Sequence, residues 1–439
     1  MLKTLVGAFK NKDIRKKILY TLMILVIVRV GSLLPIPGVD TEYFSSLLSG
    51  INTGDLSYLS AFTGGSFERM SLFALSITPY ITSSIFMQLL AIAIPKLEEM
   101  QKEGEDGRKK IAAITRYVTI ALALIESIAM AVGFGRSGLI KGYQGFSTLH
   151  YIVSIIVVVA ALTAGSAMLM WLGERITENG VGNGISIVLL INIISGMPSD
   201  FATLYSTFVA PRTIAKGVLA AAIIIAILVV MVVLVCFLQD GERRIPVQYS
   251  QKVSGRKTFG GQSTNIPLKV NTAGVMPVIF ASSLMQFPVI IAQLFGKSYE
   301  WTRYLSSSYW CRISAPKYSI GLILYIVLLI IFAYFYTSIT FNPIEVADNL
   351  KKAGGVIPGI TPGKSTSDYL NNILNYIVFV GAVGLLIIAL IPIMCTGFFN
   401  ASVSFGGTSV IIIVGVVLET LKQIESQMVN RYYKGFLSE

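Results

Sequence analysis

The sequence predicts an all-α protein that crosses a membrane many times. Hydrophobic residues make up 54% of its 439 residues, whereas charged residues make up only 13%. One or two soluble cores could not bury so much apolar surface, so lipid must be the main solvent of this chain. Continuous apolar runs of about twenty residues indicate helices, because a membrane β-barrel would instead show alternating segments of about ten residues.

Ten such runs predict ten transmembrane helices. A Lys-rich start precedes the first run, but no cleavage site of small residues follows it, so we expect a retained helix rather than a signal peptide. Pro79 and Pro277 should kink or break the second and seventh helices. The predicted spans cover residues 18–35, 71–94, 114–134, 151–172, 184–207, 217–238, 270–295, 319–341, 371–393 and 408–428.

Basic residues predict the orientation of these spans. Most of the 35 Lys and Arg residues lie at the two ends of the chain and in alternate connections, so both termini should be cytoplasmic. Ten spans then divide into two sets of five with opposite topology, which is the arithmetic of an inverted repeat with a pathway between its halves. The predicted halves are residues 1–207 and residues 208–439, the second with long cytoplasmic loops at about 239–269 and 342–370.

A short segment before the second span reads LSYLSAFTGGSFER, residues 56–69. It is too short and too polar to cross a bilayer. Two interpretations remain open from the residues alone. The segment is either a half-helix folded back into a cavity, or an ordinary external loop with one helical turn.

Charge inside the predicted spans is scarce. Glu126 lies near the middle of the third span and Arg29 well inside the first. Each costs about 3 kcal/mol in lipid, so each should face a cavity or a polar partner. A structural ion pair or a side chain that snorkels to the interface is an equal alternative for Arg29. Asn271, at the cytoplasmic start of the seventh span, is a candidate partner for Glu126.

No recognisable catalytic, metal-binding or cofactor-binding motif is present. The chain has one histidine, His150, and three cysteines without metal-ligand spacing. The glycine pairs at residues 182–184 and 406–407 lack the lysine of a phosphate-binding loop. They are better interpreted as helix starts where two backbones approach closely. We therefore expect no enzyme, no bound metal and no cofactor.

Two polar loops are the remaining candidates for function. The first, between Asp240 and Asn271, is long and basic, and the second, at 342–370, contains successive Asn-Pro, Gly-Gly and Pro-Gly turns with three lysines. Either loop could merely cap the helix bundle. Two basic loops at one mouth favour a docking platform for a cytosolic partner.

Seven segments of the chain, spread over nearly its whole length, form a recognisable set. In chain order they are RVGSLLPIPGVD, FALSITPYITSSIFMQLL, KEGEDGRKKIAAITRY, MWLGERITENGVGNGISI, GGQSTNIPLKVNTAGVMPVIFASS, FNPIEVADNLKKAGGVIPGITPG and FGGTS. Together they resemble the SecY family, the central channel subunits of the bacterial protein translocase. The resemblance covers essentially the whole chain and implies a clamshell of two five-helix halves around an hourglass pore.

The resemblance implies that a ring of apolar side chains forms the waist of the pore. A narrow apolar constriction dewets and blocks ions, yet it can flex around an extended peptide. Leu189 stands where the family usually has isoleucine, a volume-conserving change. Carried over position by position, the ring is Ile77, Ile81, Ile185, Leu189, Ile279 and Ile412.

The resemblance also implies a plug and a lateral gate. Segment 56–69 matches the family's re-entrant plug half-helix, which includes Leu59, Phe62, Gly64, Gly65 and Arg69. The slit between spans 2–3 and 7–8 would release hydrophobic segments into lipid. Its polar positions are Thr82, Glu126 and Asn271, which should hydrogen bond to one another when the gate is closed. Glu126 stands where bacterial members typically have a neutral glutamine.

The implied partners are the small membrane subunits SecE and SecG, the SecA motor, the ribosome, signal peptides, nascent polypeptides and membrane lipid. The implied location is the plasma membrane of a bacterium. Thr361 stands where the family normally has an arginine, so either a nearby lysine substitutes for it or coupling to SecA is altered. The positions expected to contact SecA or the ribosome are Arg243, Arg244, Arg256, Lys257, Lys351, Lys352, Thr361 and Lys364.

Three other functions compete with this interpretation. A secondary transporter would suit ten spans and an inverted repeat, but it should carry polar ligands at mid-membrane, where spans 2, 5, 7 and 10 are apolar. An intramembrane protease would need a Ser–His pair or two aspartates inside the spans, and these are missing. An accessory translocon for a restricted set of substrates is favoured only by Thr361.

Overall fold

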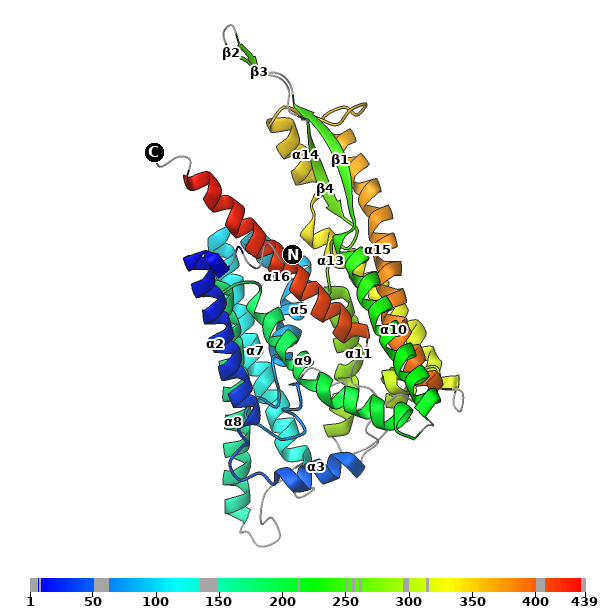
Figure 1. The fold of residues 1–439 in the computed structure, drawn as a ribbon. Helices are drawn as coiled ribbons and strands as arrows, with labels where there is room; N and C mark the ends of the chain where they lie inside the picture. The colour runs from blue at the N-terminus through cyan, green and yellow to red at the C-terminus, as the bar shows by residue number, and fades with distance from the viewer. Residues whose placement is uncertain are drawn as a thin grey trace.

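Ten long helices dominate the part of the chain that the structure describes (Figure 1). The structure is a computed structural model, and it describes residues 7, 9–50, 63–134, 148–211, 214–249, 252–254, 257–259, 263–294, 300–312, 316–399 and 407–435. The helices lie at the ten predicted positions, so the predicted helical membrane fold is confirmed. They are α2 (Lys12–Leu33), α5 (Thr78–Ala93), α7 (Glu105–Phe134), α8 (Thr148–Asn179), α9 (Gly184–Leu204), α10 (Ile214–Asp240), α11 (Met276–Leu294), α13 (Ile320–Thr340), α15 (Lys364–Phe399) and α16 (Gly407–Gly435).

Length and composition alone identify seven of these ten as spans. Six described helices are each long and apolar enough to cross a membrane, and α5 adds a seventh together with α6 (Pro95–Lys102), to which it is bent by 106°. The other three are α2, α11 and α16. α11 is apolar but short, while α2 and α16 carry charged residues along part of their length.

The second and seventh helices begin later than predicted, and proline is the reason. α5 starts at Thr78, with Pro79 in its first turn, and α11 starts at Met276, with Pro277 in its first turn. Proline is favoured at the start of a helix, because its missing N–H is one that no helical carbonyl would accept there. The expected breaks at these prolines are therefore helix starts, and residues 72–77 form turns.

The glycines at 182–184 mark a close helix start, as predicted. Gly182 has a φ of +80°, and the side chain of Asn183 caps α9 by accepting from the backbone N–H of Ile185 at 3.1 Å. A Cβ atom at Gly184 would collide with the carbonyl oxygen of Gly173 in α8. Small residues let two membrane helices approach to backbone contact, and α8 and α9 use that approach here.

The two polar loops contain a β-sheet that the sequence interpretation missed. β1 (Glu242–Tyr249) pairs antiparallel with β4 (Ser263–Lys269) and with the short β5 (Gly355–Val356), which comes from the second loop. β2 (Lys252–Ser254) and β3 (Lys257–Phe259) form a hairpin between them. Ile245 and Val247 alternate with exposed residues along β1, so one face of the sheet is buried. The two loops are thus one structural unit.

The smaller helices lie between the long ones. α3 (Thr41–Gly50) follows α2, α14 (Pro343–Lys352) precedes β5, and the short α12 (Thr302–Leu305) lies in the connection from α11 to α13. A π-helical turn, Tyr205–Val209, continues α9 toward α10. The predicted boundary between the halves, at residues 207 and 208, falls inside this turn.

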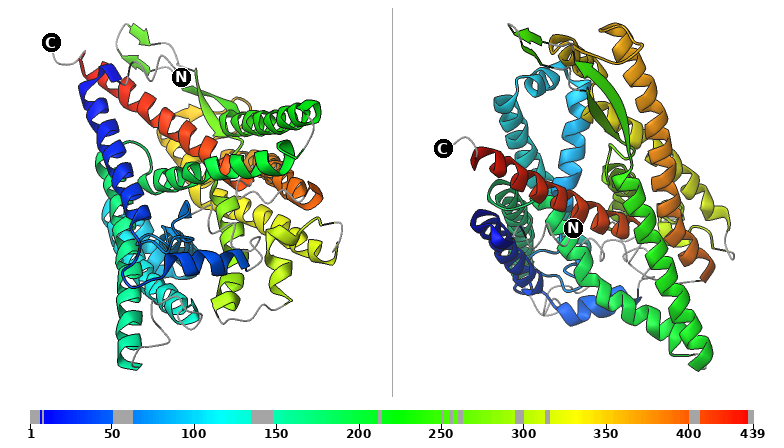
Figure 2. Two further views of the ribbon diagram at one scale, coloured as in Figure 1. Left: turned by 60° about the horizontal axis from the view of Figure 1, so that its bottom comes forward. Right: turned by 45° about the horizontal axis from the view of Figure 1, so that its top comes forward.

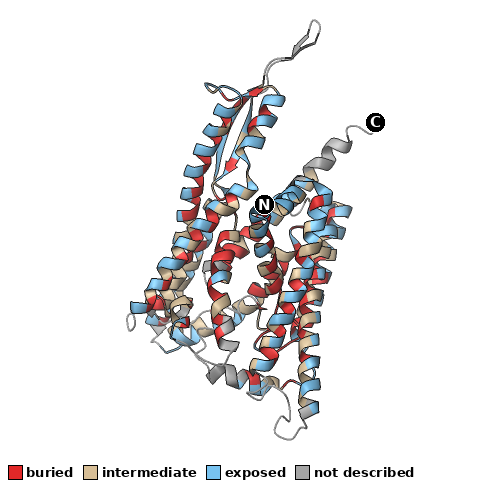
Figure 3. Cartoon of the chain, turned by 180° about the vertical axis from the view of Figure 1, so that it is seen from behind, coloured by how far each residue is buried: buried red, intermediate tan, exposed pale blue. Residues whose placement is uncertain are grey.

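The core runs through the middle of the bundle (Figure 3). Its largest cluster takes buried residues from the turns before α5 and from α2, α8, α9, α10, α11, α13, α15 and α16. α16 crosses the bundle diagonally (Figures 1 and 2), contacting both α9 and α10. Ile14 of α2 packs with Ile424 of α16, so the start of the first long helix and the end of the last lie together. We call the end of the molecule that holds β1, β4 and β5 the sheet end.

Candidate functional site

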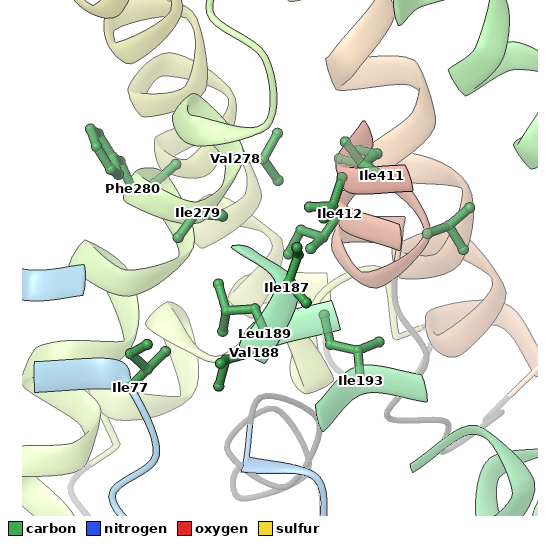
Figure 4. Packing of buried hydrophobic residues seen from close by; sticks show 14 of the residues in the cluster. Ile77, Ile187, Val188, Leu189, Ile193, Val278, Ile279, Phe280, Ile411 and Ile412 are labelled. Atoms are coloured by element: carbon green, nitrogen blue, oxygen red, sulfur yellow. The ribbon is translucent and has the colours of Figure 1, made fainter. Parts of the chain in front are cut away.

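The six residues predicted to form an apolar ring lie in one cluster of the core. Ile77, Leu189, Ile279 and Ile412 are at most 4% exposed, and Ile81 and Ile185 are half-buried against the same cluster. Figure 4 shows the four buried side chains converging from different elements. The structure therefore brings together residues from α5, α9, α11 and α16, which belong to both predicted halves.

All six side chains come from the first two turns of their helices. Ile77 is the N-cap residue of α5, Ile185 is the second residue of α9, and Ile279 lies in the first turn of α11. Four helices thus begin at one apolar point. Valine, isoleucine and leucine side chains there have no polar atoms, so they can pack or separate without leaving an unsatisfied hydrogen bond.

Further apolar residues of the cluster were not predicted. The runs GISIVLL in α9 and MPVIFA in α11 are apolar on every side, so sequence alone does not tell which positions face the centre. Among the additional buried residues are Ile187, Val188, Ile193, Val278, Phe280 and Ile411.

A buried polar network beside the cluster was also missed. Ser76 adopts a left-handed backbone conformation with a φ of +53° immediately before Ile77. Asn192 of α9 donates a hydrogen bond to the Ser76 hydroxyl at 3.1 Å, and Ser166 of α8 donates to the Ser76 carbonyl at 3.3 Å. These bonds fix the strained turn from which Ile77 projects. Asn192, an amide inside an apolar span, was the signal available in the sequence.

The predicted plug is described only from residue 63 onward, and Leu59 and Phe62 lie outside the described residues. From Gly64 to Ile77 the chain forms turns and a single β-bridge, between Ser71 and Pro35, rather than a helix, and Arg69 is exposed. Phe67 packs edge-to-face on Phe44 of α3, with ring centroids 5.8 Å apart. Met70 is fully buried in the same satellite cluster, so this segment is anchored on α3, α7 and α8.

The two predicted plug glycines have different surroundings. Both have left-handed backbones, with φ of +62° at Gly64 and +79° at Gly65. A Cβ at Gly64 would lie 2.6 Å from the Ser195 hydroxyl and 2.8 Å from the Asn192 carbonyl oxygen of α9, whereas a Cβ at Gly65 would meet nothing within 4 Å. Gly64 is therefore the point where this segment rests on α9.

The three predicted gate residues do not hydrogen bond to one another. Thr82 donates to the carbonyl of Thr78 at 3.0 Å, and Asn271 donates to the carbonyl of Gly274 at 2.9 Å. The second bond closes the turn that leads into α11. Glu126 is half-buried in α7, and α7 packs against both α5 and α11.

Arg29 is half-buried in α2, near Arg69. Its Nη1 atom is buried and has no hydrogen-bond partner among the described residues. The ion pair considered for Arg29 is not found in the described part of the chain.

The basic residues predicted to dock a partner gather at the sheet end, with two exceptions. Arg256 lies outside the described residues, and the backbone of Lys257 is in β3. Arg244 of β1 forms an ion pair with Glu242 at 2.6 Å, which neutralises part of its charge. The other predicted contacts are exposed, namely Arg243, Lys351, Lys352, Thr361 and Lys364.

Thr361 has a structural role at this end. Its carbonyl accepts a hydrogen bond from the Thr366 hydroxyl at 2.9 Å, across the start of α15. Pairing of Gln248 with Val356 and of Tyr249 with Gly355 joins the two loops. Ile245, Val247, Leu350 and Leu370 pack beneath them, so the exposed residues stand on a common apolar base.

Comparison with known proteins matches the whole chain. The family model described as SecY matches residues 71–421. The chain is 44% identical to the protein translocase subunit SecY of Streptomyces galbus and 42% identical to that of Halalkalibacterium halodurans, over 100% of each chain. Among solved structures, it resembles the SecY channel of a study on the plug domain, with a TM-score of 0.64, and Sec61 in the canine ribosome–channel complex, with a TM-score of 0.59. Each is 18% identical, and the match covers 94% of this chain and 92% of the other.

The glycine pair predicts how segment 63–77 is held. Alanine at either position meets a backbone strain of about 1–2 kcal/mol, because both glycines have left-handed φ values. Gly64→Ala in addition forces the segment away from α9. Measured by hydrogen–deuterium exchange, Gly64→Ala should speed exchange throughout residues 63–77, whereas Gly65→Ala should have only a local effect. Equal exchange in the two variants would contradict the contact with α9.

Proposed function

The chain belongs to the SecY family, and from that premise we propose that it forms a protein-conducting channel. Unfolded secretory polypeptides would pass between its two halves, and hydrophobic segments would leave sideways into the bilayer. One observation carries this proposal. Residues from four helices, two in each predicted half, meet in a single apolar contact at the centre of the bundle.

An apolar contact suits a pore that must be closed at rest. Water does not fill a narrow aliphatic constriction, so ions meet a large free-energy barrier there. An extended polypeptide can push the same side chains apart, since they offer no donors or acceptors that would hold it. The turn tied down by Asn192 and Ser166 supports a fixed position for Ile77 on one side of this constriction.

The plug and the gate are parts of the same proposal. Residues 56–69 would close the outer side of the constriction. This assignment is supported by the close contact of Gly64 with α9. The slit would lie between α5 and α7 on one side and α11 and α13 on the other. Because Thr82 and Asn271 bond within their own segments, we propose that helix packing of α7 on α11, rather than a polar latch, keeps the slit closed.

The partners and the location are also proposed. Relatives named SecY from bacteria support a bacterial plasma membrane, with both termini in the cytoplasm and SecE and SecG as membrane subunits. The sheet end would receive SecA or the ribosome through its exposed basic residues. A structural neighbour is the yeast Ssh1 complex bound to a ribosome, with a TM-score of 0.53 and 14% identity, and supports the fold alone. Energy would come from the bound partner, since a channel has no chemistry of its own.

Reconstitution tests the channel directly. The purified chain is placed in vesicles with SecE and SecG, and SecA, ATP and a signal-bearing precursor are added. We expect ATP-dependent protection of the precursor from external protease. Thr361→Arg is the informative companion, because it restores the residue usual in the family. Its effect on SecA-driven export measures how far Thr361 alters coupling.

Two results would count against parts of this proposal. No protection with wild type, but protection with Thr361→Arg, would favour an accessory translocon that uses another motor. No protection with either variant, although SecA binds and the chain is folded, would contradict the motor-driven channel.

Glu126 gives a second prediction in the same vesicles. A half-buried carboxylate beside the slit costs about 3 kcal/mol in lipid, and Glu126→Gln removes that cost while keeping the shape. The packing of α7 on α11 that keeps the slit closed then becomes more stable. Precursors with weakly hydrophobic signals should therefore be exported several-fold less, while precursors with strongly hydrophobic signals are unaffected. Glu105→Gln, at the exposed start of the same helix, is the matched control. Equal or better export of weak signals by Glu126→Gln would contradict this role.

A further inference from the structure

The connection between α11 and α13 gathers cations and aromatic rings that the proposed channel does not use. It includes α12, a 3-10 turn at Ser307–Tyr309 and another at Pro316–Ser319. It precedes the start of α13, whose other end leads to α14 and the sheet end. The cluster therefore lies at the opposite end of the molecule. We name it the outer cluster, consisting of Arg303, Tyr304, Tyr309, Arg312, Lys317 and Tyr318.

Three cations of the outer cluster lie over tyrosine rings. The guanidinium carbons of Arg303 and Arg312 are 5.8 Å and 5.1 Å from the ring centroid of Tyr309. The Nζ atom of Lys317 is 4.9 Å from the ring centroid of Tyr318. Edge-to-face contacts join Tyr318 to Tyr309 at 5.9 Å and to Tyr304 at 5.0 Å. Because ring faces attract cations, the tyrosines hold three positive charges in one patch.

A single neighbouring acid offsets these charges only in part. Within the described residues 300–312 and 316–319, Glu300 is the only acidic residue, against Arg303, Arg312 and Lys317. None of the three cations forms an ion pair in the described part of the chain. The Nε atom of Arg312 is buried and has no hydrogen-bond partner among the described residues. The patch has a net charge of about +2, so it suits an anion.

The outer cluster is held rigidly on the start of α13. Trp310 is 3% exposed, and its indole N–H donates to the carbonyl of Tyr304 at 2.8 Å. Its ring packs on Tyr325 of α13, with centroids 5.6 Å apart. The Ser319 hydroxyl accepts from the backbone N–H of Cys311 at 3.2 Å. A fixed patch loses little entropy when it binds a ligand.

Lipid contact begins immediately beside this patch. The first turns of α13 expose Ile320 by 63% and Ile323 by 62%, and in a membrane-spanning chain such residues face acyl chains. Trp301, 45% exposed, stands at the same end, as tryptophan does where a membrane meets water. The cations therefore lie where phospholipid headgroups lie.

We propose that the outer cluster binds the phosphate of an anionic phospholipid. Arg303 and Arg312 offer planar donors that match phosphate oxygens, and Lys317 adds a point charge. The bound lipid lies in the leaflet opposite the sheet end. Calling that leaflet the outer one rests on the proposed function, because the orientation of the chain in the membrane is part of that proposal. The binding of the lipid does not depend on it.

Tryptophan quenching tests the proposal without any translocation. The chain has three tryptophans, Trp171, Trp301 and Trp310, so Trp171→Phe leaves two, both in this connection. The variant is reconstituted into phosphatidylcholine vesicles in which phosphatidylglycerol is the minor lipid. In one set the acyl chains of the phosphatidylglycerol are brominated, and in the other an equal amount of phosphatidylcholine is brominated.

Brominated phosphatidylglycerol should quench about twofold or more strongly than brominated phosphatidylcholine, because the cations concentrate it near the two tryptophans. Changing Arg303, Arg312 and Lys317 together to Gln should abolish this preference. The matched control changes Arg108, Lys109 and Lys110 to Gln, which removes three exposed charges at the start of α7 and should leave the preference intact.

Two outcomes would overturn the proposal. One is equal quenching by the two lipids in the protein that retains the three cations, a comparison that needs no charge variant to fold. The other is a preference that survives in the triple Gln variant. The vesicles are prepared without inorganic phosphate, so a preference reports the lipid, and its loss on adding phosphate but not chloride would show that the headgroup phosphate is what the cluster binds. Failure of export in the reconstitution assay would not affect any of these results.

Discussion

The contact between aliphatic side chains at the starts of α5, α9, α11 and α16 is the interaction on which the rest of the structure depends. It has no hydrogen bond or ion pair of its own between these side chains, so it is held by close packing and by the exclusion of water. Such a contact can open and close again without stranding a polar group. Apolar contacts are not directional, so this contact does not determine where the four helices begin. The surrounding structure must bring four helix ends to one point.

Polar contacts next to the cluster do this positioning. Ser76 is held by Asn192 and Ser166, and Gly64 rests on the same helix, α9. Unlike the side chains of the ring, these groups would be costly to separate, because a buried donor or acceptor would lose its partner. Polar and apolar contacts therefore have different roles. Hydrogen bonds fix the backbone around Ser76 and Gly64 within the first predicted half. Apolar contacts join that half to the helices of the second.

The sequence was sufficient to predict the helix positions, and the six residues proposed for the apolar ring lie in one cluster, but the local geometry around them was not predicted. Apolar runs of membrane length and the motifs shared with the family located the helices. Pro79 and Pro277 predicted breaks in the second and seventh spans. They did not indicate that each helix would begin at its proline rather than end there. The sheet was hidden, because the alternation of Ile245 and Val247 includes Pro246 and is flanked by charged residues, and its third strand comes from a distant loop. The bonds that the resemblance implies among Thr82, Glu126 and Asn271 in a closed gate are not found in the structure, where Thr82 and Asn271 each donate within their own segment.

Electrical recording of the resting channel tests the central claim most directly. The chain is reconstituted with SecE and SecG, the proposed membrane partners, into planar bilayers without precursor, SecA or ribosome. Conductance is recorded for wild type and for Ile279→Gly combined with Ile412→Gly. Leu374→Gly, a buried residue of α15 in a separate cluster, controls for general loosening of the fold. An apolar seal predicts silent membranes for wild type and for Leu374→Gly, and frequent openings for the double variant. A silent double variant, or a Leu374→Gly variant that leaks equally, would contradict the assignment of the seal to this cluster.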